Sequence, residues 1–71
     1  MNFEVGKCYK HTTGAMIHVL CEVETMMYGK CLVAEEAGKT DLIPIGKGDG
    51  YAENWECIPI EEFQRFYTDK E

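Results

Sequence analysis

The stretch "YKHTTGAMIHVLCEVETMMYGKCLVAEE", residues 9–36, decides the fold class. Apolar and polar side chains alternate along residues 15–26 and again along residues 30–36, a period of two that is typical of strands burying one face. A Met-Tyr-Gly turn at 27–29 joins these two segments, and a His-Thr-Thr-Gly turn at 11–14 precedes them. The stretch therefore predicts consecutive strands of an antiparallel sheet.

The flanking sequence predicts further short elements. Val5 to His11 forms a first strand, and Leu42 to Ile45 a fourth, where Pro44 lacks a donor N–H and favours an edge or a bulge. Asn54 to Ile58 forms a fifth strand, which contains Trp55, and Pro59 opens a short helix to about Tyr67. We expect one mainly β domain over residues 1–71: a small five-stranded antiparallel SH3-like barrel with a short C-terminal helix.

The longest strand, 15–26, assigns its side chains to two faces. The core face is expected to hold Ile17, Val19, Cys21, Val23 and Thr25. The other face is mixed, apolar at its start and acidic later, with Met16, His18, Leu20, Glu22, Glu24 and Met26. His18 is thereby expected on a surface that is neither fully buried nor fully solvated.

Size and charge limit the partners. A chain of 71 residues buries a small core, so self-association into a homo-oligomer is expected. Residues 35–71 hold ten of the 13 acidic and four of the seven basic side chains, which places the whole net charge of −6 there. Such a charge repels phosphate backbones, so no nucleic-acid partner is expected. DNA mimicry is the functional alternative, but the interspersed bases favour a solvated charged surface.

The start of the chain has no secretion signal, and no apolar run is long enough to span a membrane, so we expect a cytoplasmic protein with no membrane partner. In that compartment the four cysteines are expected to be reduced thiols: Cys8, Cys21, Cys31 and Cys57.

Two spacings are typical of metal-ligand pairs, Cys8-x-x-His11 and His18-x-x-Cys21. Residues three apart in an extended strand point to opposite faces, however, so no metal site is expected.

The sequence also lacks the residue patterns that are usual for catalysis and for cofactor binding. The chain contains no serine, its cysteines lie in strands, and the adjacent pairs Glu35-Glu36 and Glu61-Glu62 diverge instead of forming an acid/base couple. The alternating glycines at 46, 48 and 50 are not followed by a helix, as a phosphate-binding loop requires. We expect a non-enzymatic protein without a cofactor.

One group of side chains offers donors, a thioether and an aromatic face, the mixture that ligand pockets use. The candidate ligand-binding residues are His11, Thr12, Thr13, His18, Met26, Tyr28 and Lys30. They meet only if the long strand curls across the barrel. The amides of the Thr12-Thr13-Gly14 turn could bond a phosphate, with Lys10 or a histidine nearby. The alternative is that both histidines are ordinary surface or hydrogen-bonded core groups.

Three segments, "YKHTTGAMIHVL", "YGKCLVAEE" and "NWECIPIEEF", resemble small uncharacterised proteins encoded by phages and prophages of Firmicutes. The resemblance covers residues 7–66. It implies a class in which some members cover a host defence protein, as anti-CRISPR proteins do, and others sequester the nucleotide signal of CBASS or Thoeris immunity.

The resulting expectation is a non-enzymatic phage-encoded binding protein in the cytoplasm of the bacterial host. It would antagonise immunity by sequestering a nucleotide signal. One alternative is an inhibitor that binds a protein of a host defence complex; another is a structural or regulatory phage accessory protein.

Overall fold

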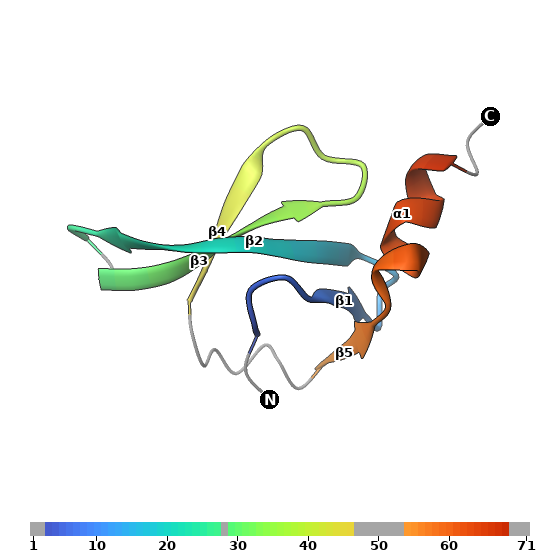
Figure 1. The fold of residues 1–71 in the computed structure, drawn as a ribbon, viewed down its shortest axis with the longest axis horizontal. Coiled ribbons are helices and arrows are strands. Elements are labelled where there is room, and N and C mark those ends of the chain that lie inside the picture. Colours follow the sequence, from blue (N-terminus) through green and yellow to red (C-terminus); the bar gives the residue numbers. More distant parts are fainter. Residues whose placement is uncertain (1–2, 28, 47–53, 69–71) are drawn as a thin grey trace.

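The computed structural model describes residues 3–27, 29–46 and 54–68. Its elements, in chain order, are β1 (Cys8–His11), β2 (Met16–Thr25), β3 (Gly29–Glu36), β4 (Leu42–Gly46), β5 (Trp55–Ile58) and α1 (Ile60–Thr68). The predicted mainly β class with a C-terminal helix is confirmed (Figure 1).

The five strands form one antiparallel sheet in the order β4-β3-β2-β1-β5. In the described part of the chain β4 and β5 are the two edges and do not pair, so the sheet is not closed and the expected SH3-like barrel is wrong in this respect. Closure requires ladder hydrogen bonds between the edge strands. Strand β5 has four residues, all paired with β1, and Pro44 of β4 has no N–H to donate.

Strand β1 begins at Cys8 and not at Val5, because a turn occupies the preceding residues. The Lys7 N–H donates to the Glu4 carbonyl at 3.2 Å, and Gly6 adopts a φ of 89°. The Gly6 N–H still donates to the Val19 carbonyl at 2.8 Å. The segment thus stays attached to β2 without continuing the regular ladder.

A bulge interrupts β2 at Leu20. Val19 pairs with Ala34, but Cys21 pairs with Val33, so Leu20 is an extra residue between them. The alternation of side chains between the two faces of the sheet shifts by one residue at this point, so Cys21 and Val23 lie on the face opposite to that of Val19. Of the five residues expected on the core face, only Ile17 and Val19 are buried; Cys21, Val23 and Thr25 are not, which corrects that prediction.

Two hydrophobic clusters lie on opposite faces of the sheet. The main-core face holds the buried residues Phe3, Tyr9, Ile17, Val19, Leu32 and Ala34, with Ile43, Ile45 and Trp55 packed against them. The helix face holds the buried residues Cys8, Ile58 and Phe63, with Met16 and Ala37 packed against them. The sheet therefore separates two hydrophobic clusters, one on each of its faces.

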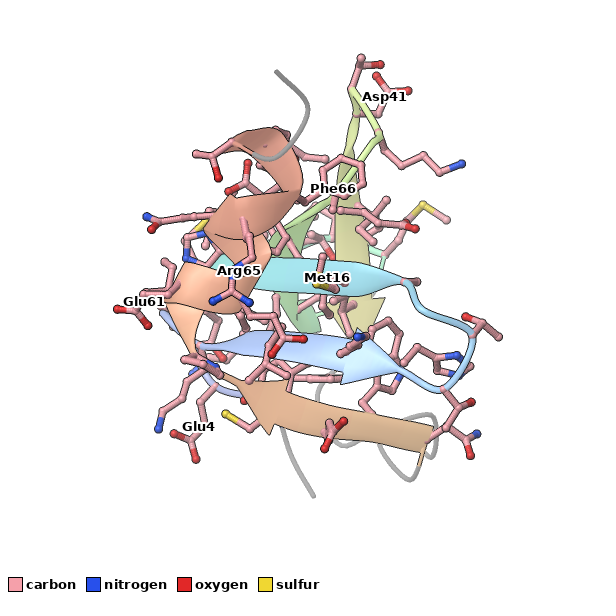
Figure 2. The ribbon with its side chains drawn as sticks, turned by 90° about the vertical axis from the view of Figure 1, so that its right-hand side faces the viewer. Glu4, Met16, Asp41, Glu61, Arg65 and Phe66 are labelled. Atoms are coloured by element: carbon pink, nitrogen blue, oxygen red, sulfur yellow. The ribbon has the colours of Figure 1, made fainter. Side chains whose placement is uncertain are left out.

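Helix α1 covers the helix face, with Phe63 as its buried side chain and the ring of Phe66 close to Gly38. Phe63 is buried, while Glu61 and Arg65 are exposed and project from α1 in Figure 2. Acidic residues occupy the first turn and Arg65 the last turn, as the helix dipole favours. An ion pair of 3.4 Å between Lys10 and Glu62 links α1 to β1. Within the described ranges, no helix is long and apolar enough to span a membrane.

Candidate functional site

His11 and His18 lie on opposite faces of the sheet. His18 pairs with Cys8, whose side chain belongs to the helix face. His11 is three residues after Cys8 in the extended strand β1, so it points to the main-core face. The two imidazoles therefore do not share a site.

His18 is held within the fold. Its Nδ1 lies 2.9 Å from Oε2 of Glu35 on β3, and its ring centroid is 5.6 Å from that of Phe63. The imidazole thereby connects β2, β3 and α1. These contacts agree with the alternative interpretation, in which His18 is a hydrogen-bonded group of the fold and not a ligand-binding residue.

His11 stands at the end of β1 against Trp55 of the neighbouring β5, with ring centroids 4.8 Å apart. Its Nδ1 lies 2.9 Å from Oγ1 of Thr13, and the Thr13 backbone N–H donates to the same Nδ1 at 3.2 Å. A backbone N–H can only donate, so Nδ1 is the acceptor and the neutral ring has its proton on Nε2. His11 is therefore oriented, with a donor group opposite the turn.

A groove of about 380 Å³ opens on the main-core face beside these two rings, and we call it the Trp55 groove. Among the described residues it is lined by Phe3, His11, Thr13, Ala15, Ile17, Glu36, Ile43, Pro44, Ile45 and Trp55. Trp55 also contacts Phe3 edge-on, with centroids 5.9 Å apart. The groove thus combines aromatic and aliphatic walls with few polar groups, as ligand pockets do.

A second hollow of about 400 Å³ shares His11 and Trp55 with the groove. Its other lining residues are Lys10, Thr12, Asn54 and Glu56. The Thr12 N–H donates to the Asn54 carbonyl at 3.2 Å, which ties the β1–β2 turn to the start of β5. The two hollows meet at this end of the β1–β5 pair.

The expected phosphate contact with the turn amides is wrong. All three N–H groups already have acceptors: that of Thr12 the Asn54 carbonyl, that of Thr13 the His11 Nδ1, and that of Gly14 the His11 carbonyl at 2.9 Å. Any anion at this place would instead meet side chains such as Lys10.

The structure brings together three of the seven candidate residues. His11 and Thr13 line the Trp55 groove, and Thr12 lines the second hollow. His18 lies on the helix face, while Met26 and Lys30 are exposed at the far end of the β2–β3 hairpin, at the left in Figure 1. Tyr28 lies outside the described residues.

Sequence reasoning missed Trp55 and Glu36 as groove residues. Trp55 was expected only as a residue of the fifth strand, and Glu36 only as a carboxylate that diverges from Glu35. In the register Glu36 pairs with Ile17 and Glu35 with His18, so the two carboxylates occupy opposite faces. A period-two reading of 30–36 contained this separation, but the residues across the sheet from each could not be deduced from it.

Ligand sets for metals are not assembled in the part of the chain that the structure describes: no three His, Cys, Asp or Glu side chains there are placed to hold an ion. All four cysteines are free thiols, with Cys8 and Cys31 buried and Cys21 and Cys57 exposed. Burial raises the pKa of the Cys8 thiol, and the nearby Cys57 and Glu35 raise it further.

This contrast predicts the order of thiol alkylation. Treatment with N-ethylmaleimide at pH 8 is expected to modify Cys21 and Cys57 first, because both are exposed. Cys8 is expected to react at least about tenfold more slowly, since a raised pKa lowers its thiolate fraction and burial blocks access. Peptide mass spectrometry over time measures the order, and denatured protein, in which all four thiols react, is the control. Early labelling of Cys8 would contradict the described packing.

Comparisons with protein-family models, with curated proteins and with solved structures give no match for this chain. The Trp55 groove and the hollow beside it are therefore the features of the molecule from which a function can be proposed.

Proposed function

We propose that the protein is a non-enzymatic binding protein that retains a small nucleotide, with the base in the Trp55 groove. The observation that carries this proposal is the groove itself: about 380 Å³, with Trp55 and His11 in edge-to-face contact at a centroid distance of 4.8 Å and with aliphatic residues of β4 in its lining. Aromatic side chains stack on the flat faces of bases, which contributes about 1–3 kcal/mol per base.

The second hollow supports the placement of the phosphate. It adjoins the groove through His11 and Trp55, and it offers Lys10 together with the Thr12 side chain. The Lys10 side chain is 41% exposed, and its ion pair with Glu62 is long at 3.4 Å, so the ammonium can turn toward a ligand. A nucleotide with its base in the groove would direct its phosphate to this side.

The His11–Thr13 contact favours retention of the ligand over turnover. A hydroxyl beside an imidazole resembles a nucleophile with its base. Here the Thr13 backbone N–H also donates to Nδ1, and the single lone pair of that nitrogen is thereby shared. The imidazole serves as a fixed wall and donor.

The proposed biological role rests on the resemblance of three segments to phage and prophage proteins. In that setting, retention of a nucleotide would sequester an immune signal of the bacterial host and so antagonise its defence. Two adjacent exposed methionines at the end of the β2–β3 hairpin, Met26 and Met27, support association with a second copy. The alternative role, binding a protein of a defence complex, predicts a chain that ignores nucleotides.

Trp55 is the single tryptophan of the chain, so its fluorescence reports directly on the groove. Titration with a panel of linear and cyclic nucleotides is expected to quench this fluorescence. His11→Ala is expected to weaken retention at least about tenfold without unfolding the protein, because it removes a stacking wall and a donor at the surface. Native mass spectrometry of the same mixtures gives the stoichiometry and the oligomeric state.

Two substitutions at the far end of the hairpin serve as controls, Met26→Ala and Lys30→Ala. Both side chains are exposed and lie away from the groove, so wild-type retention is expected. Wild-type retention by His11→Ala, or the absence of quenching by every nucleotide of the panel, would remove the proposed site.

A further inference from the structure

Glu36 is the one charged side chain among the described residues that line the Trp55 groove. It ends β3 on the main-core face, where it pairs with the buried Ile17. No other described residue forms a hydrogen bond or ion pair with its carboxylate. The groove therefore presents an acceptor that the rest of the described fold does not use.

The polar groups of the groove form a pattern. Glu36 contributes two acceptor oxygens, and His11 contributes a donor because its proton is on Nε2. No lysine or arginine lines the groove among the described residues, so nothing there neutralises the carboxylate. A ligand that fits must bring hydrogen-bond donors to Glu36 and an acceptor to His11.

The two purines differ on the edge that would meet these groups. Guanine presents an acceptor at O6 and two adjacent donors at N1 and the 2-amino group. Adenine presents a donor at its 6-amino group beside an acceptor at N1, and that acceptor faces a carboxylate unfavourably. Bidentate pairing of this kind is the usual means of base discrimination.

We propose that the Trp55 groove selects guanine over adenine through Glu36, with His11 available for O6. This inference rests on the proposed nucleotide binding and names the base that the site takes. Trp55 stacks on either purine and so contributes affinity, whereas Glu36 contributes the choice between them.

The test uses GMP, IMP and AMP, titrated by calorimetry and by Trp55 fluorescence. IMP retains the donor at N1 but lacks the 2-amino group. The expected order of affinity is GMP, then IMP, then AMP, with at least about a tenfold difference between GMP and AMP.

Glu36→Gln is the decisive variant. A glutamine presents one acceptor and one donor, so it loses one of the two contacts to guanine and accommodates adenine. GMP affinity is expected to fall about tenfold while AMP affinity stays or rises. Glu35→Gln is the matched control: it changes the adjacent carboxylate on the opposite face, and it is expected to leave the GMP-to-AMP ratio unchanged.

The outcomes separate the two proposals. If wild-type protein binds AMP as tightly as GMP, or Glu36→Gln retains the wild-type ratio, the selection by Glu36 is overturned and nucleotide binding stands. If none of the three mononucleotides binds, this inference is overturned, and the wider nucleotide panel then decides the proposed function. Equal melting temperatures of wild type and Glu36→Gln confirm that the variant is folded.

Discussion

Val19→Asp is expected to leave the chain unfolded at 25 °C. Val19 is fully buried in the main-core cluster, where an aspartate would place an unpaired carboxylate. The cost of such a burial is several kcal/mol. A domain of 71 residues has a stability of about 4–10 kcal/mol, so most or all of it would be lost. Circular dichroism and urea titration measure the result.

Val23→Asp is the matched control, with the same substitution four residues later in the same strand. Strict alternation assigns both valines to the core face, but the bulge at Leu20 lies between them. Val23 is 38% exposed, and its replacement is expected to cost less than about 1 kcal/mol. Equal destabilisation by the two substitutions would show that β2 alternates without interruption.

Phe63→Ala is expected to release α1 from the sheet. Phe63 is 3% exposed and packs with Cys8 and Ile58 on the helix face, beside the ring of His18. Truncation of a buried phenylalanine costs about 3–5 kcal/mol. For a domain of this size that loss lowers the melting temperature by roughly 12 °C or more. Thermal unfolding followed by circular dichroism measures the shift and the loss of helical signal.

Ile60→Ala provides the comparison within the same helix. Ile60 is 38% exposed at the first residue of α1, and its truncation is expected to cost less than about 1 kcal/mol. A melting temperature of Phe63→Ala equal to that of Ile60→Ala would mean that the helix face has no cluster of its own.

The order and approximate bounds of all six elements could be predicted from the sequence, because alternation and turn residues are local signals. The turn at 11–14 shows why this works. The Gly14 N–H donates to the His11 carbonyl, and Gly14 adopts a φ of 100°, a conformation that glycine reaches without steric cost. Pro59 similarly stands directly before α1, whose first residue is Ile60.

Pairing across the sheet could not be predicted in the same way. The bulge at Leu20 is a property of the β2–β3 register, and neither strand alone contains a signal for it. The open sheet depends on which strands become neighbours. Because of this register and strand order, Cys21 and Val23 are exposed where burial was expected, and the sheet does not close into a barrel.

The candidate site depends on the same long-range pairing. His11 and Thr13 could be selected because they belong to one turn, but Trp55 meets His11 only because β5 pairs with β1. Glu36 reaches the groove only because it is opposite Ile17. Glu36 and Trp55 are thus far from His11 and Thr13 in the sequence but line the same groove, and no local pattern connects them.

The bulge at Leu20 also divides β2 into two parts that differ in how well they tolerate substitution. Before the bulge, Ile17 lines the Trp55 groove and Val19 is buried in the same cluster. A substitution at either residue therefore alters the packing around the groove. After the bulge, residues 21–27 are exposed or half-buried and contribute no buried side chain to either cluster. Substitutions in that outer segment leave the packing of the Trp55 groove unchanged, so the hairpin is the part of this fold on which new surface properties can evolve at little cost in stability.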